Sequence, residues 1–342
     1  MAATLLGRQA AAIALQAVVL TAVVLAAVLA GPASRASAAP DPEGASKTLR
    51  AALESAAKGH IVAKQRLAAS QKRQKSLQVT ILRTQVEVTA METEVRAVAG
   101  RAYRLGRFNT MSLLLNATSP DTFLQRAKGL DVMARLDGKA LERYRAAVET
   151  HQRANAALSL EIKEQQKQVT VLAKKKKEAE DALAAAGGGQ VAGGFVSANS
   201  PLAKPAPRNS DGSWPDEKCT IDDPTTSGCI TPRLLNSYQQ AKKAGFDHHT
   251  SCFSQRSSGE HPKGRACDFA ADKGGFGGTA SGSSRTYGNN LAAYFVKNAD
   301  RLGVMYVIWF REIWMPSTGW RSYSGSGSPS ADHTNHVHLS VL

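Results

Sequence analysis

The sequence predicts a protein of two unlike parts, an N-terminal all-α antiparallel coiled-coil hairpin followed by a small C-terminal α+β domain. In residues 46–186, apolar side chains recur at alternating spacings of four and three, and Pro120 is the one proline. All four cysteines and all four tryptophans lie beyond residue 210. This change of composition places the second domain at 211–342, and a chain of 342 residues is long enough for two domains.

Residues 1–38 are typical of a secretory signal. Arg8 precedes an apolar run at 10–30, and Ala36, Ser37 and Ala38 form a small-residue cleavage pattern, so we expect a cut after Ala38. An uncleaved membrane anchor is the alternative, because the run is long enough to span a bilayer. Both interpretations place the rest of the chain outside the cytoplasmic membrane, as a secreted or membrane-anchored protein.

Two runs of heptad-spaced apolar residues predict the coiled coil at 46–186. The first run is Leu77, Ile81, Val88, Met91, Val95, Val98, Ala102 and Leu105, and the second is Leu141, Tyr144, Val148, Leu158, Ile162, Val169, Leu172, Ala179 and Leu183. Gly106 and the segment 116–120 interrupt the helix between them. We therefore expect two antiparallel helices of roughly 55–60 residues, each about 85 Å long.

The predicted end of this hairpin is unusually apolar. Its members are Met111, Leu113, Leu114, Leu115 and Phe123. One interpretation is a cap that buries its own leucines in a short extra helix. The other is a docking surface for a membrane protein.

The positive charge of the chain belongs mostly to the coiled coil. The whole chain carries +15, and residues 46–186 hold 26 lysine and arginine residues against 14 acidic ones, a net charge of +12. Nucleic acid is an unsuitable partner for an exported protein. Anionic lipid headgroups or wall polymers suit a basic exported surface better.

Beyond the coiled coil, residues 187–210 are rich in glycine and proline and predict a flexible linker. In the domain that follows, the patterns predict helices at 231–244 and 289–302. They predict strands at 266–270, 304–309 and 336–341, and a Gly/Ser-rich surface loop at 273–285.

Four cysteines in an exported domain predict two disulfide bonds. Sequence proximity favours Cys219–Cys229 and Cys252–Cys267, although three connectivities are possible. A catalytic cysteine is the disfavoured alternative. Cys-His peptidases usually carry the nucleophile in an Asp-Cys-Ser sequence, whereas Cys267 lies between Ala266 and Asp268.

Four side chains near the C-terminus predict a metal site. His261 and Asp268 flank a turn with Pro262 and Gly264, and His336 and His338 share one face of the predicted last strand. Zinc binds imidazole and carboxylate groups, and catalytic zinc sites combine three protein ligands with a water. We expect His261, Asp268 and His338 to bind Zn²⁺ and His336 to act as the catalytic base.

The pattern E-H-x-x-G-R-A-x-D with a terminal H-V-H resembles the zinc D,D-peptidase superfamily, which includes D-Ala-D-Ala carboxypeptidases, murein endopeptidases and hedgehog-like domains. The resemblance implies a zinc-peptidase-like fold for 211–342, the same three ligands, His336 as acid/base and Arg256 as an aid to the substrate carbonyl. The family's serine two residues before the first ligand is absent, because Gly259 stands there. The coiled coil is similar to the leaders of bacterial cell-wall hydrolases, which implies that it docks or restrains the catalytic domain.

These expectations describe a wall-associated zinc metallopeptidase that hydrolyses peptide bonds in peptidoglycan stem peptides, as a D,D-carboxypeptidase or an endopeptidase. The alternative is a non-catalytic module that binds the wall or activates another hydrolase. A complete ligand set favours the enzyme.

Overall fold

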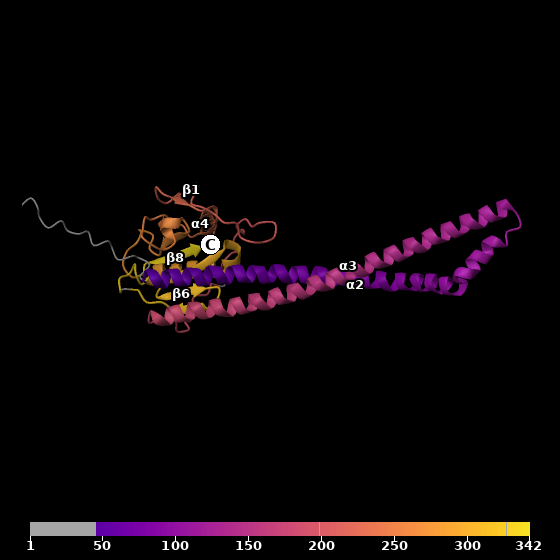
Figure 1. Ribbon diagram of the computed structural model, residues 1–342. Coiled ribbons are helices and arrows are strands. Elements are labelled where there is room, and N and C mark those ends of the chain that lie inside the picture. The colour runs from indigo at the N-terminus through magenta and orange to yellow at the C-terminus, as the bar shows by residue number, and fades with distance from the viewer. Residues whose placement is uncertain (1–45, 198, 326) are drawn as a thin grey trace, which may run out of the picture.

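The computed structural model describes residues 46–342 apart from 198 and 326. The predicted signal at 1–38 lies outside the described residues. Within them, no helix combines the length and apolar character that a membrane span requires. The chain forms a long helical hairpin and a small antiparallel-sheet domain, which we call the head (Figure 1), and the predicted fold class is thereby confirmed.

The hairpin consists of α2 (Lys47–Leu115) and α3 (Pro120–Ala185). The helices have 69 and 66 residues and are each about 100 Å long, longer than predicted. The excess in α2 arises because the helix resumes beyond Gly106, where a φ of 54° produces a kink, and continues to Leu115. Both predicted interruptions, at Gly106 and before Pro120, are present.

Polar residues in the seam between the helices fix how the helices align. Gln165 Nε2 donates a hydrogen bond to Gln74 Oε1 over 2.7 Å, and Thr84 Oγ1 lies 3.0 Å from His151 Nδ1. Each bond joins residues far apart in the sequence, so a slip of one helix past the other would break it. These interruptions of the apolar stripe therefore specify the register.

The distal end of the hairpin exposes its apolar side chains. We call this surface the apolar tip, and it comprises Met111, Leu113, Leu115, Phe123 and Leu124. Leu115 is 75% exposed and Phe123 is 42% exposed, whereas Leu114 is half-buried. The interpretation that this end buries its own leucines is therefore wrong, although a short helical segment does follow Gly106.

The head is built on a six-stranded sheet in which all neighbouring strands are antiparallel. Its order is β3 (Thr250–Ser251), β4 (Ala266–Ala270), β8 (His336–Val341), β5 (Val304–Trp309), β6 (Glu312–Met315) and β7 (Gly319–Ser322). The three predicted strands are β4, β8 and β5, which lie side by side. A separate two-stranded pair joins β1 (Ile221–Asp222) to β2 (Cys229–Ile230).

One face of the sheet packs against the helices of the head, and we call it the α5 face. These helices are α4 (Pro232–Lys243), α5 (Gly282–Lys297) and α6 (Ala299–Leu302). Phe269, Val307 and Leu339 project from three strands into the same core as Leu291 and Phe295 of α5. The predicted helix at 231–244 is confirmed. Helix α5 starts earlier than predicted, at Gly282, so the Gly/Ser-rich loop is shorter.

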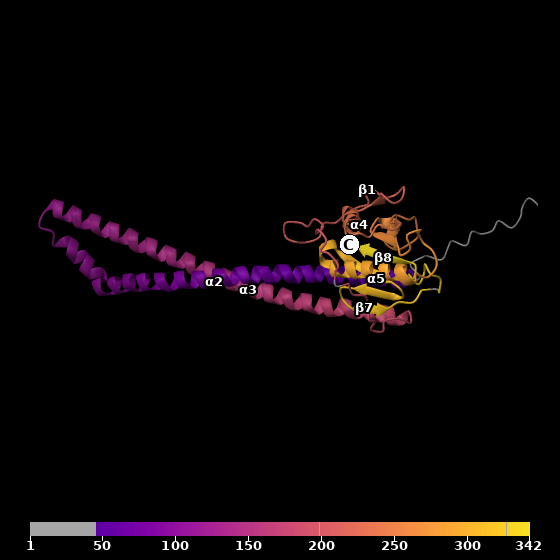
Figure 2. The same ribbon diagram turned by 180° about the vertical axis from the view of Figure 1, so that it is seen from behind.

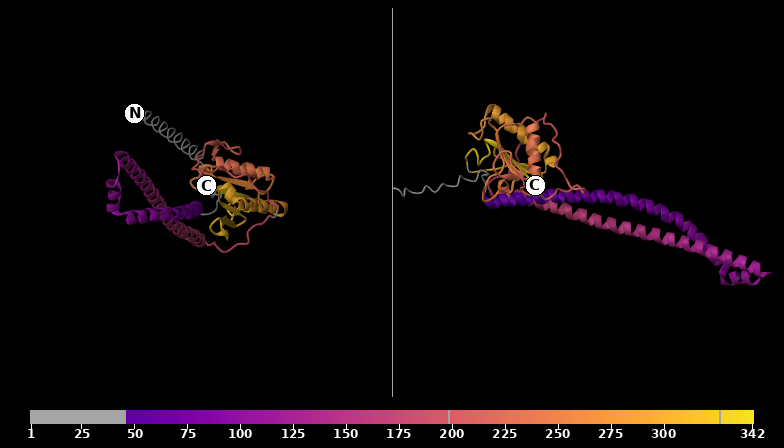
Figure 3. Two further views of the ribbon diagram at one scale, coloured as in Figure 1. Left: turned by 90° about the vertical axis from the view of Figure 1, so that its right-hand side faces the viewer. Right: turned by 90° about the horizontal axis from the view of Figure 1, so that it is seen from above.

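The opposite face packs against the base of the hairpin, and we call it the hairpin face (Figures 2 and 3). The hairpin root comprises Leu49, Leu53, Ala56, Ala57 and Ile61 of α2 with Ala179 and Leu183 of α3. These side chains share a core with Met305, Tyr306, Ile308, Ile313 and Met315 of the sheet. Because both helices contribute to this core, the hairpin and the head are one packed unit.

Residues 187–210 differ from the expected flexible linker because they lie along the head. Gly189 N donates to Ser322 O over 3.0 Å, and Ala206 N donates to Arg301 O over 2.8 Å. Ala203 is buried, and its N–H donates to Asn298 Oδ1 over 2.8 Å. The small alanine side chains let this proline-rich backbone approach the helices, so the segment is fastened at several points along its length.

Candidate metal centre

The sheet register brings two of the predicted ligands face to face. Asp268 of β4 and His338 of β8 are direct cross-strand partners. Their neighbours Phe269 and Leu339 belong to the core on the α5 face, so alternation along each strand directs Asp268 and His338 to the hairpin face. The strands that sequence patterning predicted therefore position two of the three candidate ligands.

His261 reaches the same place from the short helix η1 (His261–Lys263). Gly264 ends η1 with a φ of 66°, and a Cβ atom there would lie 2.4 Å from Cys219 Sγ and 2.8 Å from Cys229 O. Only glycine fits this turn. Gly264 thus allows the chain to turn from the His261 loop into β4 within a few residues.

The potential ligand atoms of His261, Asp268 and His338 all lie within 4.8 Å of one another, and all three residues are buried. Asp268 Oδ1 is 3.2 Å from His261 Nε2 and 2.9 Å from His338 Nδ1, and the two nitrogen atoms are 3.4 Å apart. A tetrahedral zinc ion with bonds of roughly 2.0–2.1 Å separates its ligand atoms by about 3.3 Å. The spacing therefore fits a small divalent cation, and two imidazoles with a carboxylate suit zinc.

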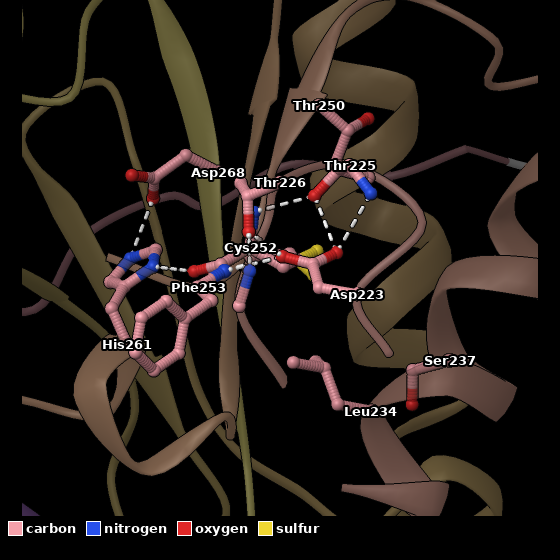
Figure 4. Close-up of a disulfide and its surroundings, with 12 residues drawn as sticks. Asp223, Thr225, Thr226, Leu234, Ser237, Thr250, Cys252, Phe253, His261 and Asp268 are labelled. Carbon is pink, nitrogen blue, oxygen red and sulfur yellow. Dashed lines mark hydrogen bonds and ion pairs between the residues drawn. A yellow bond between two sulfur atoms is a disulfide. The ribbon is translucent and has the colours of Figure 1, made fainter. Parts of the chain in front are cut away.

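Hydrogen bonds orient the two imidazoles. His261 Nδ1 bonds to the carbonyl oxygen of Cys252, which can only accept, so Nδ1 carries the proton (Figure 4). His261 Nε2 then presents a lone pair toward the carboxylate. His338 Nε2 lies 2.8 Å from Ser340 Oγ, which leaves His338 Nδ1 to face Asp268. Such partners of the non-coordinating ring nitrogen are typical of metal-binding histidines.

Asp268 is held as an anion. Burial alone would raise the pKa of its carboxyl group, but the surrounding imidazoles of His261, His336 and His338 keep that pKa well below its usual value. A carboxylate and the lone pair of His261 Nε2 face each other at 3.2 Å, and two electron-pair donors repel at that distance. A bound cation relieves this repulsion.

The predicted base, His336, lies beside the three ligands rather than among them. Its Nδ1 atom is 2.7 Å from Asn335 Oδ1. The amide nitrogen of Asn335 donates to Gly277 O, so the amide oxygen faces His336 and accepts a hydrogen bond from Nδ1. His336 Nε2 is then an acceptor, 3.4 Å from Asp268 Oδ1 and without a hydrogen-bond partner among the described residues. Burial lowers the pKa of His336 to about 4, so the ring is neutral at pH 7.

The predicted substrate-assisting residue, Arg256, also lies at the site. Its Nη2 atom is 3.4 Å from Asp268 Oδ2. The side chains of Arg256 and Asp268 are 14% and 10% exposed, whereas His261 and His338 are almost fully enclosed. Solvent therefore reaches the site from the side of Arg256 and Asp268.

Sequence patterning missed His333. Its ring is buried, 4.7 Å from the ring of His336 and 5.6 Å from that of His338, and its backbone φ is 51°. Its Nδ1 atom is 3.1 Å from Ala331 O, and its Nε2 has no hydrogen-bond partner among the described residues. Burial and then the nearby imidazoles lower the pKa of His333 well below its usual value. Three histidines within six residues were the available signal.

A disulfide and a buried carboxylate support the segment that orients His261 (Figure 4). The disulfides are Cys219–Cys229 and Cys252–Cys267, the pairs that sequence proximity favours. Asp223 accepts hydrogen bonds from Phe253 N and from the hydroxyls of Thr225 and Thr226. The same Thr225 hydroxyl accepts from Cys252 N. Two disulfides are also consistent with an extracytoplasmic location.

Replacing both Cys252 and Cys267 by alanine will lower the free energy of unfolding by about 3 kcal/mol, because the bond closes a loop of 15 residues. If His261, Asp268 and His338 bind a metal ion, the same change will weaken the binding of added zinc by roughly 10–100-fold, since the Cys252 carbonyl orients His261. The matched control replaces Cys219 and Cys229, which close a loop of 10 residues and carry no ligand. Urea unfolding and zinc titration measure both effects. Equal zinc affinity in the two variants would contradict this role of the bond.

Comparison with known proteins gave one result. A family model described as VldE, C-terminal domain, matches residues 226–334. The matched range contains His261, Asp268 and His333 and stops before His336 and His338. Neither the curated proteins nor the solved structures include a match to the chain.

Proposed function

We propose that this chain is an exported zinc-dependent peptidase that hydrolyses peptide bonds in peptidoglycan stem peptides. The observation that carries the proposal is the convergence of two imidazole nitrogens and a carboxylate oxygen at 2.9–3.4 Å, with the acceptor Nε2 of His336 beside them. The resemblance of E-H-x-x-G-R-A-x-D and H-V-H to the zinc D,D-peptidases supplies the reaction class and the substrate.

His261 Nε2, Asp268 Oδ1 and His338 Nδ1 would hold the ion. When bound, zinc supplies Lewis acidity, which polarises a carbonyl group and brings the pKa of a water molecule to about 7. His336 Nε2 would accept the proton of the attacking water and pass it to the leaving amine. Arg256, at the solvent-accessible side, would stabilise negative charge on the carbonyl oxygen.

The hairpin root would restrain the site. Arg50 of α2 is buried and its Nη2 atom donates to Ser258 Oγ, three residues before His261. Glu54, one helical turn further along α2, accepts hydrogen bonds from Lys263 and Arg265, which flank Gly264 at the end of η1. Through these bonds the position of α2 would set the position of the His261 loop.

Purified muropeptides test the proposal directly. The chain from residue 39 onward, loaded with zinc, should release either a terminal D-alanine or the products of crosslink cleavage, and mass spectrometry distinguishes these two outcomes. A chelator should stop the reaction and added zinc should restore it. A nucleophilic thiol is not a competitor, because all four cysteines form disulfides.

A non-catalytic module that binds the wall or activates another hydrolase is the second candidate function. A zinc-loaded chain that sediments with purified wall but releases no product from any muropeptide would favour this candidate over the enzyme.

A further inference from the structure

The apolar tip exposes apolar side chains on two sides of α2, next to the polar pair Ser112 and Asn116. Met111 and Leu115 lie four residues apart and therefore on one side of the helix, while Leu113 lies on the opposite side. All three side chains are exposed. A surface helix normally buries its apolar side chains against the rest of the protein and exposes polar ones, whereas here the apolar side chains are the exposed ones.

Helix α3 extends this apolar surface. Phe123 and Leu124 follow the turn, and Val132 and Leu136 are 56% and 60% exposed a few helical turns further along. Figures 1 and 2 place this end of the hairpin at the greatest distance from the head, so the head does not cover it. Whatever covers the tip comes from outside the described chain.

Basic residues surround the tip. Residues 101–128 contain five arginine or lysine residues and one acidic residue, Asp121, a net charge of +4. Lys128 is exposed on α3, and Arg104 is exposed on α2 beside Tyr103, which is 90% exposed. Arg126 donates to the carbonyl oxygens of Leu113 and Asn116, over 2.8 and 3.1 Å, and so places its charge at the end of α2.

We infer that the apolar tip docks on the surface of an anionic lipid bilayer. The apolar side chains enter the boundary between headgroups and acyl chains, and the basic residues contact lipid phosphates. Tyr103 has the amphipathic ring that favours the same boundary. A second copy of the chain fits less well, because each tip carries +4 and the hairpin itself is basic, so two copies repel. The inference stands apart from the proposed hydrolase.

Vesicle sedimentation tests the inference. The chain from residue 39 onward is used, because the apolar run at 10–30 would itself bind lipid. It should bind phosphatidylglycerol–phosphatidylcholine vesicles, bind pure phosphatidylcholine more weakly, and lose affinity as salt rises. Leu115→Ser with Leu124→Ser should weaken binding at least about tenfold. Arg104→Gln with Lys128→Gln should weaken it and reduce the salt dependence.

The matched control is Leu160→Ser with Val169→Ser. These residues lie along α3 and are 67% and 55% exposed, so the change in surface hydrophobicity is similar. Circular dichroism melting verifies that every variant stays folded, and a chelator should leave vesicle binding unchanged. Equal loss of binding in tip and control variants would overturn the inference. So would failure of the unaltered chain to bind anionic vesicles, and the tip would then be assigned to a protein partner.

Discussion

In the proposed zinc peptidase, replacing Asp268 by asparagine will remove the metal and lower turnover by about 1000-fold or more. The carboxylate is the group that the other two ligands share, since its Oδ1 atom lies 3.2 Å from His261 Nε2 and 2.9 Å from His338 Nδ1. An amide oxygen keeps the shape but loses the charge that holds the cation. The Lewis acidity of zinc contributes several kcal/mol to such reactions, and each 1.4 kcal/mol is tenfold in rate.

His336→Gln is the matched comparison. His336 lies 3.4 Å from the same carboxylate oxygen but outside the three-ligand group. If His336 is the base, this variant keeps one zinc per chain and loses roughly 100–10,000-fold in kcat. Steady-state kinetics on a muropeptide, together with metal analysis of each variant, separates the roles. Loss of zinc in His336→Gln would make His336 a ligand, and unchanged turnover would remove it from the mechanism.

Replacing Leu183 by alanine will destabilise the head by about 2–5 kcal/mol, although Leu183 lies near the end of α3. Its side chain is fully buried in the core that joins the hairpin root to Met305, Tyr306 and Ile308. Shortening it leaves a cavity that the sheet and the helices cannot close. Tryptophan fluorescence during urea unfolding reports on the head alone, because all four tryptophans lie beyond residue 210.

Leu160→Ala is the control for this experiment, since Leu160 lies on the same helix and is 67% exposed. Its effect should stay within about 0.5 kcal/mol. A fluorescence transition that Leu183→Ala does not shift would mean that the hairpin unfolds independently of the head. The core on the hairpin face would then contribute nothing to the stability of the metal site.

Local patterns in the sequence predicted the elements that carry the ligands. The strands at 266–270, 304–309 and 336–341 coincide with β4, β5 and β8. The first two are short runs of mostly apolar residues, and the third alternates polar with apolar residues. The break at Gly106 and the two disulfide pairs were also predicted correctly. Each of these features depends on residues close together in the chain.

The packing of the hairpin on the sheet was not predicted, because it joins residues more than 100 positions apart. One signal was available. All six residues of β5, VMYVIW, are apolar or aromatic, and such a strand must be covered on both faces. Since the helices of the head cover one face, a second layer was required, and the hairpin root supplies it. His333 escaped notice because only the folded loop brings it to His336.

Zinc-edge X-ray absorption on the metal-loaded chain tests whether His261, Asp268 and His338 hold one ion. We expect one zinc per chain with nitrogen and oxygen ligands at roughly 2.0–2.1 Å, two of them imidazoles, and no sulfur. His338→Ala should remove one imidazole contribution or the metal altogether. A chain that binds no zinc, or one whose spectrum shows sulfur ligands, would contradict the proposed site and the peptidase activity built on it.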